Sequence, residues 1–257
     1  FCLSRGLGDV YKRQAQRITG KPAHMRIFWY YLGLGVFLLA IYACARRNEK
    51  HKDCRETADL CVSRRKKRLQ GIVFSCFIAF LLLFLLFPQK KSFEIDFLDV
   101  GQGDGIYLCT GGGTSMFIDG GSTDVKQVGK YRILPFLKAK GVSEISYWFV
   151  SHTDTDHVSG LKEVLVSGYR VEYLVFAKAV EKEAKTKELA ELARSHGTKV
   201  FYMQAGDTVR SKRAAMRCLY PKASDKAEDV NDLCLVLQFE EGDIRALFGG
   251  DISTDVE

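Results

Sequence analysis

The chain has 257 residues, of which 47% are hydrophobic and 27% charged, and its formal net charge is +7 at pH 7. The charge is unevenly divided, because residues 1–87 hold 16 Lys and Arg against 5 Asp and Glu, whereas residues 88–257 hold 22 against 26. The second part is therefore mildly acidic, which excludes a generally basic nucleic-acid-binding surface there. Any contact with a phosphate backbone must come from a local basic patch or a metal ion.

The first residues are excluded from the predicted fold. Residues 4–14, with the sequence SRGLGDVYKRQ, can be back-translated into a transposon adapter used in sequencing libraries. We therefore interpret residues 1–14 as an adapter artefact rather than a protein element. A genuine basic leader is the alternative. If the adapter interpretation holds, the chain is a fragment whose natural sequence continues upstream.

Two uncharged apolar segments, about residues 28–45 and 71–87, are each close to the length that crosses a bilayer. Residues 46–70 between them form a predicted basic loop with ten Lys and Arg and four Asp and Glu. The positive-inside rule places this loop in the cytoplasm and residues 88 onward outside. We therefore predict a multi-pass cell-membrane protein with a hairpin over residues 15–91 in the lipid bilayer. A pair of buried core helices is the alternative.

Residues 92–257 are long enough to form a core of their own, and predicted strands alternate with predicted helices along them. This pattern predicts an α/β domain. Apolar alternation and turn residues indicate strands over 93–98, 106–110, 114–118, 199–203, 233–239 and 244–248. Helical periodicity indicates helices over 131–140 and 181–195.

The most informative motif is the run from Ser151 to His157, which packs His152, Asp154, Asp156 and His157 into six residues. The run follows the apolar stretch 147–150, so we expect a buried strand that delivers these side chains onto the loop at its end. Imidazole nitrogen suits zinc, and carboxylates widen the choice to manganese or magnesium. The pattern predicts a divalent metal site, with an ordinary polar turn as the alternative.

Two further carboxylates end apolar runs and touch glycine pairs. Asp119 precedes Gly120 and Gly121, and Asp251 follows Gly249 and Gly250. Glycine permits close approach of the backbone to an ion, so both are expected at the same site. The glycine-rich turn over residues 101–105 is expected to bring Asp99 or Asp104 near the metal edge.

Two other groups of residues are less informative. His196 could complete a ligand set, but its position before Gly197 favours a surface histidine at a helix end. The eight cysteines form no metal or disulfide framework that the spacing reveals, and small buried hydrophobic side chains are the preferred interpretation.

Taken together, these motifs resemble the metallo-β-lactamase fold over roughly residues 93–257. More narrowly, they resemble the metal-dependent extracellular domain of the ComEC competence proteins, which carry transforming DNA across the bacterial membrane. The strings that carry the resemblance are FLDVGQGDGIYL, FIDGG, VGKYRILPFLKAKGV, VSHTDTDHVSGL, NDLCLVL and LFGGD. As in the ComEC group, Asp154 stands where most hydrolases of the superfamily have His. Asn231 stands where the superfamily has a further His.

The resemblance implies an αββα sandwich over residues 92–257, truncated before its C-terminal end and preceded by two transmembrane helices. It also implies one divalent ion held by His152 and Asp154, a second held by Asp156 and His157, and Asp251 bridging both. Zinc or manganese is expected, with Asp156 and Asp251 in catalytic roles. Asp119 would orient a ligand histidine, and Asn231 would weaken the first site.

The activity implied by the resemblance is hydrolysis of DNA phosphodiesters during internalisation, with DNA and other segments of the competence channel as partners. Two alternatives remain open at this stage. The domain could gate or support the transport channel without cutting DNA. It could also hydrolyse small esters or lactams, although proteins of that subgroup usually keep the His that Asp154 replaces.

Overall fold

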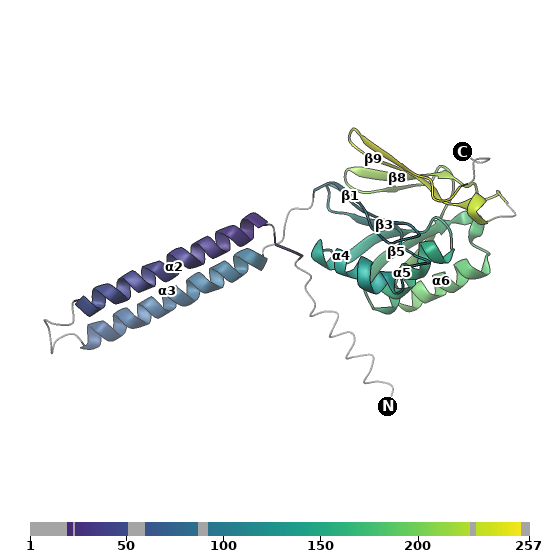
Figure 1. The fold of residues 1–257 in the computed structure, drawn as a ribbon. Coiled ribbons are helices and arrows are strands. Elements are labelled where there is room, and N and C mark those ends of the chain that lie inside the picture. Colours follow the sequence, from purple (N-terminus) through teal and green to yellow (C-terminus); the bar gives the residue numbers. More distant parts are fainter. Residues whose placement is uncertain (1–19, 23, 51–59, 87–91, 227–229, 253–257) are drawn as a thin grey trace, which may run out of the picture. The chain divides into compact units, whose positions relative to one another are not determined.

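The structure is a computed structural model that describes residues 20–22, 24–50, 60–86, 92–226 and 230–252. The chain divides into two units, Thr19–Gln89 and the part from Lys90 to Glu257, which Figure 1 shows as a helical pair and an α/β domain. Residues 1–14, interpreted above as an adapter, lie outside the described residues. Each unit is described by itself.

The first unit is a hairpin of two α-helices, α2 (His24–Lys50) and α3 (Leu60–Leu86). Stacked rings join the two helices, because the ring of Phe37 lies 5.1 Å from that of Phe74 and 4.3 Å from that of Phe77. Among the described residues, one helix is long and apolar enough to cross a membrane, over His24–Ala43. The described apolar part of α3, Gly71–Phe84, is shorter. By length and composition, the described residues thus contain one candidate span, and the apolar part of α3 falls short of a second.

The predicted basic loop is mostly helical. Residues 46–50 belong to α2 and residues 60–70 belong to α3, so the basic segment predicted between the two spans continues both helices in these two stretches. Lysine and arginine have high helix propensity, and each apolar helix is extended by such residues at its polar end. Residues 51–59 lie outside the described part of the chain.

A six-stranded mixed sheet forms the centre of the α/β domain. Its strands are β1 (Glu94–Phe97), β2 (Gly105–Cys109), β3 (Ser115–Asp119), β4 (Glu144–Phe149), β5 (Arg170–Ala177) and β6 (Lys199–Met203), in that spatial order. The first three strands are antiparallel, and β3 to β6 are parallel. The carboxyl ends of β3 and β4 therefore lie side by side at one edge of the sheet.

Three helices, α4 (Leu134–Ala139), α5 (Thr155–Val166) and α6 (Ala184–Ser195), cover one face of this sheet (Figure 1). A π-helical turn, η1 (Gly129–Ile133), leads into α4, and a 3-10 turn, η2 (Lys178–Val180), precedes α6. Between the helices and the sheet lies an apolar core in which the rings of Phe117 and Trp148 stack at 4.4 Å. Burial of such large rings is the main stabilising contribution in this layer.

A second, four-stranded antiparallel sheet packs on the other face. It contains β7 (Thr208–Arg210), β8 (Ala214–Tyr220), β9 (Val236–Glu241) and β10 (Ile244–Phe248), in the order β10-β9-β8-β7. A 3-10 turn, η3 (Val230–Leu233), precedes β9. The two sheets enclose a second apolar core, which contains Phe149, Val175, Met216 and Phe239.

The predicted α/β class and two-sheet sandwich are confirmed. Within residues 92–226 and 230–252, the helices supply one outer layer, and none of the α-helices covers the outer face of the four-stranded sheet. The strands predicted over 199–203 and 244–248 match β6 and β10. The strand predicted over 233–239 begins later, at Val236, because Leu233 belongs to η3.

An ion-pair cluster fastens the edge strand β1 to the end of α4. Lys140, whose side chain is 28% exposed, donates to Glu94 and lies 3.0 Å from Asp96 Oδ2. Burial alone would lower the pKa of Lys140, but hydrogen bonds to these two carboxylates raise it above the ordinary value of 10.5. The charged form of Lys140 therefore stabilises the folded domain.

We expect Lys140→Met to lower the free energy of unfolding by roughly 1 kcal/mol at neutral pH, because two carboxylates lose a partly buried partner. Because the pKa is raised in the folded state, the contribution is present below pH 10.5 and disappears as pH rises through the folded-state pKa. Denaturant unfolding measures the effect. The exposed Lys138 provides the control, and equal losses for Lys138→Met and Lys140→Met would contradict the assignment.

Candidate metal centre

The predicted ligands come from separate segments that meet at one edge of the sandwich. Asp119 ends β3, the run from Ser151 to His157 follows β4, and Asp251 follows β10. The parallel pairing of β3 with β4 places the first two segments next to each other. Loops at the carboxyl ends of such strands commonly carry functional groups on a rigid scaffold.

Asp119 connects β3, the loop after β4 and α5. Its side chain is buried, and its backbone adopts a left-handed conformation with φ of 57°. Oδ1 accepts a hydrogen bond from Ser151 N–H at 2.7 Å, and Oδ2 lies 3.1 Å from His157 Nδ1. The Asp119 carbonyl accepts a further bond from Trp148 Nε1 at 2.6 Å. The carboxylate thus fixes the ring of His157, which is the position expected of a residue that orients a ligand.

Glycine allows three backbone segments to approach within contact distance. A β-carbon on Gly121 would lie 2.4 Å from the Asp156 carbonyl oxygen and 2.5 Å from His157 N. One on Gly103 would lie 2.4 Å from the same carbonyl oxygen, and Gly103 also has a φ of +142°. Neither position accommodates a side chain unless the backbone moves. The loops after β1 and β3 therefore pack directly against the start of α5.

The first cluster of possible ligands contains His152, Asp156 and His157, whose ligand atoms all lie within 4.8 Å of one another. Both histidines are buried, and their ring centroids are 3.9 Å apart. Asp156 and His157 lie in the first turn of α5, so the expectation that the whole motif sits on a loop was wrong for these two residues. The directions of the Asp156 and His157 side chains are therefore set by the regular backbone of the first helical turn.

The second cluster contains Asp104, His157 and Asp251, whose ligand atoms also lie within 4.8 Å of one another. His157 Nε2 is 3.3 Å from Asp251 Oδ2. Of the two carboxylates proposed for the turn after β1, Asp104 therefore approaches the cluster. Asp99 is exposed and lies 3.8 Å from Arg132 instead.

Asp154 lies outside both clusters. Its Oδ1 accepts a hydrogen bond from Lys185 Nζ at 2.8 Å, and its Oδ2 lies 3.9 Å from His152 Nε2. Since Lys185 engages only Oδ1, Asp154 can keep this contact and still offer Oδ2 as a ligand beside His152. Asn231 belongs to η3, but its side chain lies outside the described part of the structure.

Carboxylates dominate the electrostatics of the site. Burial and the nearby charge of Asp119 raise the pKa of Asp104. Burial also acts to lower the pKa of His157, but its hydrogen bond to Asp119 and the surrounding carboxylates outweigh burial and raise that pKa to about 9. Burial and the adjacent His157 lower the pKa of His152. Both the crowding of anions and the stabilised positive charge on His157 indicate a position that favours a cation.

Sequence reasoning did not identify two neighbours of His152. Ser151 Oγ lies 3.1 Å and Cys234 Sγ 3.4 Å from His152 Nδ1. Cys234 is fully buried, and burial raises its pKa to about 12, so its thiol remains protonated near neutral pH. Only the position of Cys234 at the start of the strand predicted over 233–239 could have indicated this contact. His196, by contrast, lies at the end of α6 with Nδ1 2.9 Å from the Leu192 carbonyl.

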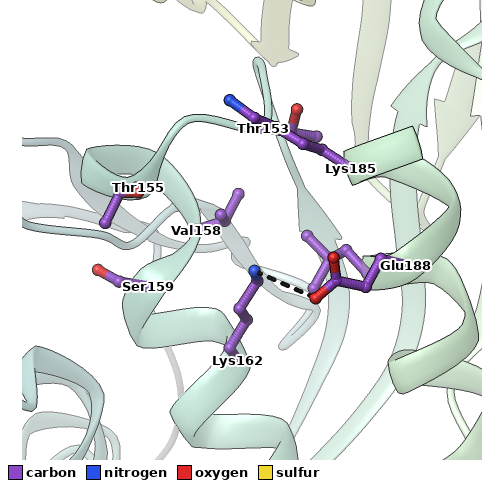
Figure 2. Close-up of a pocket in the computed structure, with 8 residues that line it drawn as sticks. Thr153, Thr155, Val158, Ser159, Lys162, Lys185 and Glu188 are labelled. Atoms are coloured by element: carbon purple, nitrogen blue, oxygen red, sulfur yellow. Dashed lines mark ion pairs between the residues drawn. The ribbon is translucent and has the colours of Figure 1, made fainter. Parts of the chain in front are cut away.

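A pocket of about 280 Å³ lies next to the motif, between α5 and α6 (Figure 2). Thr153 and Ser159 contribute hydroxyl groups to its lining, and Lys162 and Lys185 contribute ammonium groups. Lys162 pairs with Glu188 at 3.9 Å, and Lys185 pairs with Asp154. Since both lysines have carboxylate partners, the pocket carries little excess positive charge.

The mixed α/β sandwich with buried histidines and carboxylates at one sheet edge is the arrangement of a metallo-β-lactamase-like domain. No family model matches the chain. ComE operon protein 3 of Bacillus subtilis is 28% identical over 214 residues, which cover 77% of this chain and 27% of that protein. Recombination protein 2 of Haemophilus influenzae is 31% identical over 106 residues, which cover 40% of this chain and 13% of that protein.

Among solved structures, a metallo-β-lactamase from Cronobacter sakazakii aligns with a TM-score of 0.44 and 13% identity, over 60% of each chain. Over most of its length the chain is therefore similar in sequence to ComE operon protein 3. It spans about a quarter of the length of ComE operon protein 3.

We expect Gly121→Ala to displace the start of α5, because its new β-carbon would overlap the backbone of Asp156 and His157. The predicted result is weaker binding of divalent ions by at least about tenfold, the loss typical when the support of a metal ligand is disturbed. Titration calorimetry on the full chain measures it. Gly112→Ala is the matched control, since its nearest neighbours would be side-chain atoms at 3.6 Å. Unchanged metal affinity for Gly121→Ala would contradict the packing argument.

Proposed function

We propose that the domain is a metal-dependent hydrolase that cleaves DNA phosphodiesters during DNA uptake. The observation that carries the proposal is the convergence of two clusters on His157, one with His152 and Asp156 and the other with Asp104 and Asp251. Buried histidines beside carboxylates suit zinc or manganese. The substrate is taken from the resemblance of the sequence motifs to the ComEC competence proteins, and ComE operon protein 3 is a relative with similar sequence.

The contacts of His157 limit how the ligands can be shared. Its Nδ1 is engaged by Asp119, so only Nε2 is free to bind an ion. Nε2 faces Asp251, which supports an ion held by Asp156 and His157 with Asp251 as the bridging carboxylate. Asp104, which groups with His157 and Asp251, would be an additional ligand of the same ion. His152 remains for the other ion, where Asp154 would join it through Oδ2, which lies 3.9 Å from His152 Nε2.

The ligand side chains differ in their exposure to solvent, and this difference suggests different roles. Asp251 is 48% exposed, so a phosphodiester can approach it from solvent. His152 and His157 are buried behind it and present fixed nitrogen atoms. When bound, a divalent ion supplies Lewis-acid polarisation of a phosphoryl oxygen and lowers the pKa of a coordinated water. In this proposal Asp156 and Asp251 hold the reacting centre, and Asp119 keeps His157 in the ligand orientation.

One observation favours a second function, a domain that gates a DNA channel without cutting DNA. Asp154 is tied to Lys185 and lies outside both ligand clusters, so the site with His152 has fewer engaged ligands. With so few ligands, the site with His152 would bind no second ion, and the domain would support the channel without catalysing hydrolysis. Metal content and cleavage, measured together on one preparation, distinguish the two functions.

We expect Asp251→Ala to lose both bound metal and manganese- or zinc-dependent DNA cleavage, because the bridging carboxylate is removed. Asp156→Asn is expected to abolish cleavage while leaving the strand scaffold in place. Elemental analysis and a nuclease assay on the full chain in detergent measure both effects, and circular dichroism checks the fold.

His196→Ala is the control, since His196 lies away from the cluster at the end of α6, and it should retain metal and cleavage. If Asp251→Ala keeps the same metal content as the unaltered chain, the ligand assignment is wrong. If the unaltered chain binds no divalent ion and Asp156→Asn supports normal DNA uptake in cells, the gating function replaces the nuclease.

We also propose that the α2–α3 hairpin crosses the cell membrane and that the domain faces outside, on the basis of the basic residues between the two apolar segments. With the natural cysteines replaced, we expect Lys182→Cys to react with a membrane-impermeant thiol reagent in intact cells, because Lys182 is exposed on the domain. His51→Cys, between the helices, should react only after permeabilisation. The reverse pattern would contradict this orientation.

A further inference from the structure

A second pocket, of about 330 Å³, opens between β6 and β7, at the edge where the two sheets are not joined by hydrogen bonds. Tyr147, Tyr173 and Phe201 line it from three neighbouring parallel strands. The rings of Tyr147 and Tyr173 stack with centroids 5.1 Å apart, and the ring of Phe201 lies 5.4 Å from that of Tyr173. Together these three side chains form what we call the aromatic row.

The aromatic row is accessible from solvent. Phe201 is 52% exposed, although an aromatic side chain of this size normally buries most of its surface in a core. Tyr147 and Tyr173 are half-buried. The part of the chain that the structure describes leaves the outer end of the row uncovered, so a flat apolar ligand could stack on Phe201 and continue the row.

Two positively charged side chains, Lys199 and Arg210, lie at the row. Lys199 Nζ lies 4.9 Å from the centre of the Tyr173 ring, and Arg210 lines the pocket from β7. The β7–β8 hairpin, residues 208–220, contains Arg210, Lys212, Arg213 and Arg217 and no acidic residue. All four side chains are exposed, and none forms an ion pair within the described residues.

Two carboxylates near the row, Asp207 and Glu172, each have a partner within the domain. Asp207 Oδ2 accepts a hydrogen bond from Gln204 N–H at 3.0 Å, and Glu172 lies 4.0 Å from Lys199. The hairpin is therefore a local basic patch on a domain that is acidic as a whole. Such a patch complements a polyanion, and exposed stacked rings complement bases.

We propose that the aromatic row and the basic β7–β8 hairpin form a docking surface for single-stranded DNA. A base would stack on Phe201 at the open end of the row, and phosphates would meet Arg210. An unpaired strand fits better than a duplex, because only unpaired bases expose their faces to aromatic side chains. This inference rests on the proposed function for its choice of DNA as the polyanion.

The row lies within reach of the candidate metal centre. Tyr147 is on β4, five residues before His152. At about 3.3 Å per extended residue, the separation along the strand is about 16 Å. A single strand of moderate length can therefore contact both places, with the docking surface holding DNA and the metal centre acting on it.

Binding is tested on the full chain in detergent, with EDTA present so that no cleavage occurs. The probe is a fluorescent oligothymidylate of about 15 nucleotides, the upper range for small single-strand-binding folds. We expect Phe201→Ala to weaken binding roughly tenfold, because one stacking position is lost. Phe201→Trp should retain binding, and an abasic strand of equal length should bind the unaltered chain weakly.

Tyr131→Ala is the matched control. Tyr131 is 61% exposed, and Lys130 Nζ lies 4.9 Å from its ring centre, so it has the same local chemistry as Tyr173 outside the pocket. This variant should bind like the unaltered chain. Arg210→Ala should reduce the slope of log affinity against log salt by about one, as expected for one lost phosphate contact.

The proposal fails if Phe201→Ala, with its fold verified by circular dichroism, binds the probe as tightly as the unaltered chain. Equal affinity for abasic and base-containing strands would also overturn it. A cross-link from a photoreactive group at residue 201 to another segment of the protein in place of DNA would assign the surface to a protein contact. Loss of cleavage in Asp251→Ala with normal probe binding tests the proposed hydrolase separately.

Discussion

The buried carboxylate of Asp119 is the contact on which the geometry of the metal centre depends. It accepts a bond from Ser151 N–H and lies against His157 Nδ1, so it joins β3, the loop after β4 and the first turn of α5. Its left-handed backbone is costly for most residues, and aspartate is among the few that tolerate it. The sheet holds Asp119 in this conformation, since Trp148 also donates to its carbonyl oxygen.

The same contact separates the roles of the two imidazole nitrogens of His157. Since Nδ1 faces Asp119, Nε2 must face Asp251 and the open side of the site. Gly103 and Gly121 permit close backbone packing against the start of α5, and Ser122 N–H donates to Ser159 Oγ on that helix at 2.9 Å, which holds the helix in this orientation. The ligands are thus positioned by backbone contacts that are formed on folding, which lowers the cost of organising them around an ion.

Much of this arrangement was predictable because it follows from local rules. Alternation of apolar residues located β6 and β10, and the positions of Asp119 and Asp251 after apolar runs next to glycine pairs indicated that both belong to one site. Two features were not predictable. The diversion of Asp154 depends on Lys185, which is distant in sequence and comes from α6. The helical state of residues 60–70 depends on propensity extending α3 beyond its apolar segment.

The distribution of charge explains why a docking surface and a reaction centre would be separate in this domain. Asp104, Asp119, Asp156 and Asp251 make the metal centre strongly anionic, so in the absence of ions it repels a phosphate backbone. Attraction for DNA must therefore come from elsewhere, and the basic β7–β8 hairpin supplies it without opposing carboxylates within its own sequence. A divalent ion would reverse the local repulsion only where the reaction occurs. The domain could then hold a strand at one place and admit it to the metal centre only when ions are bound.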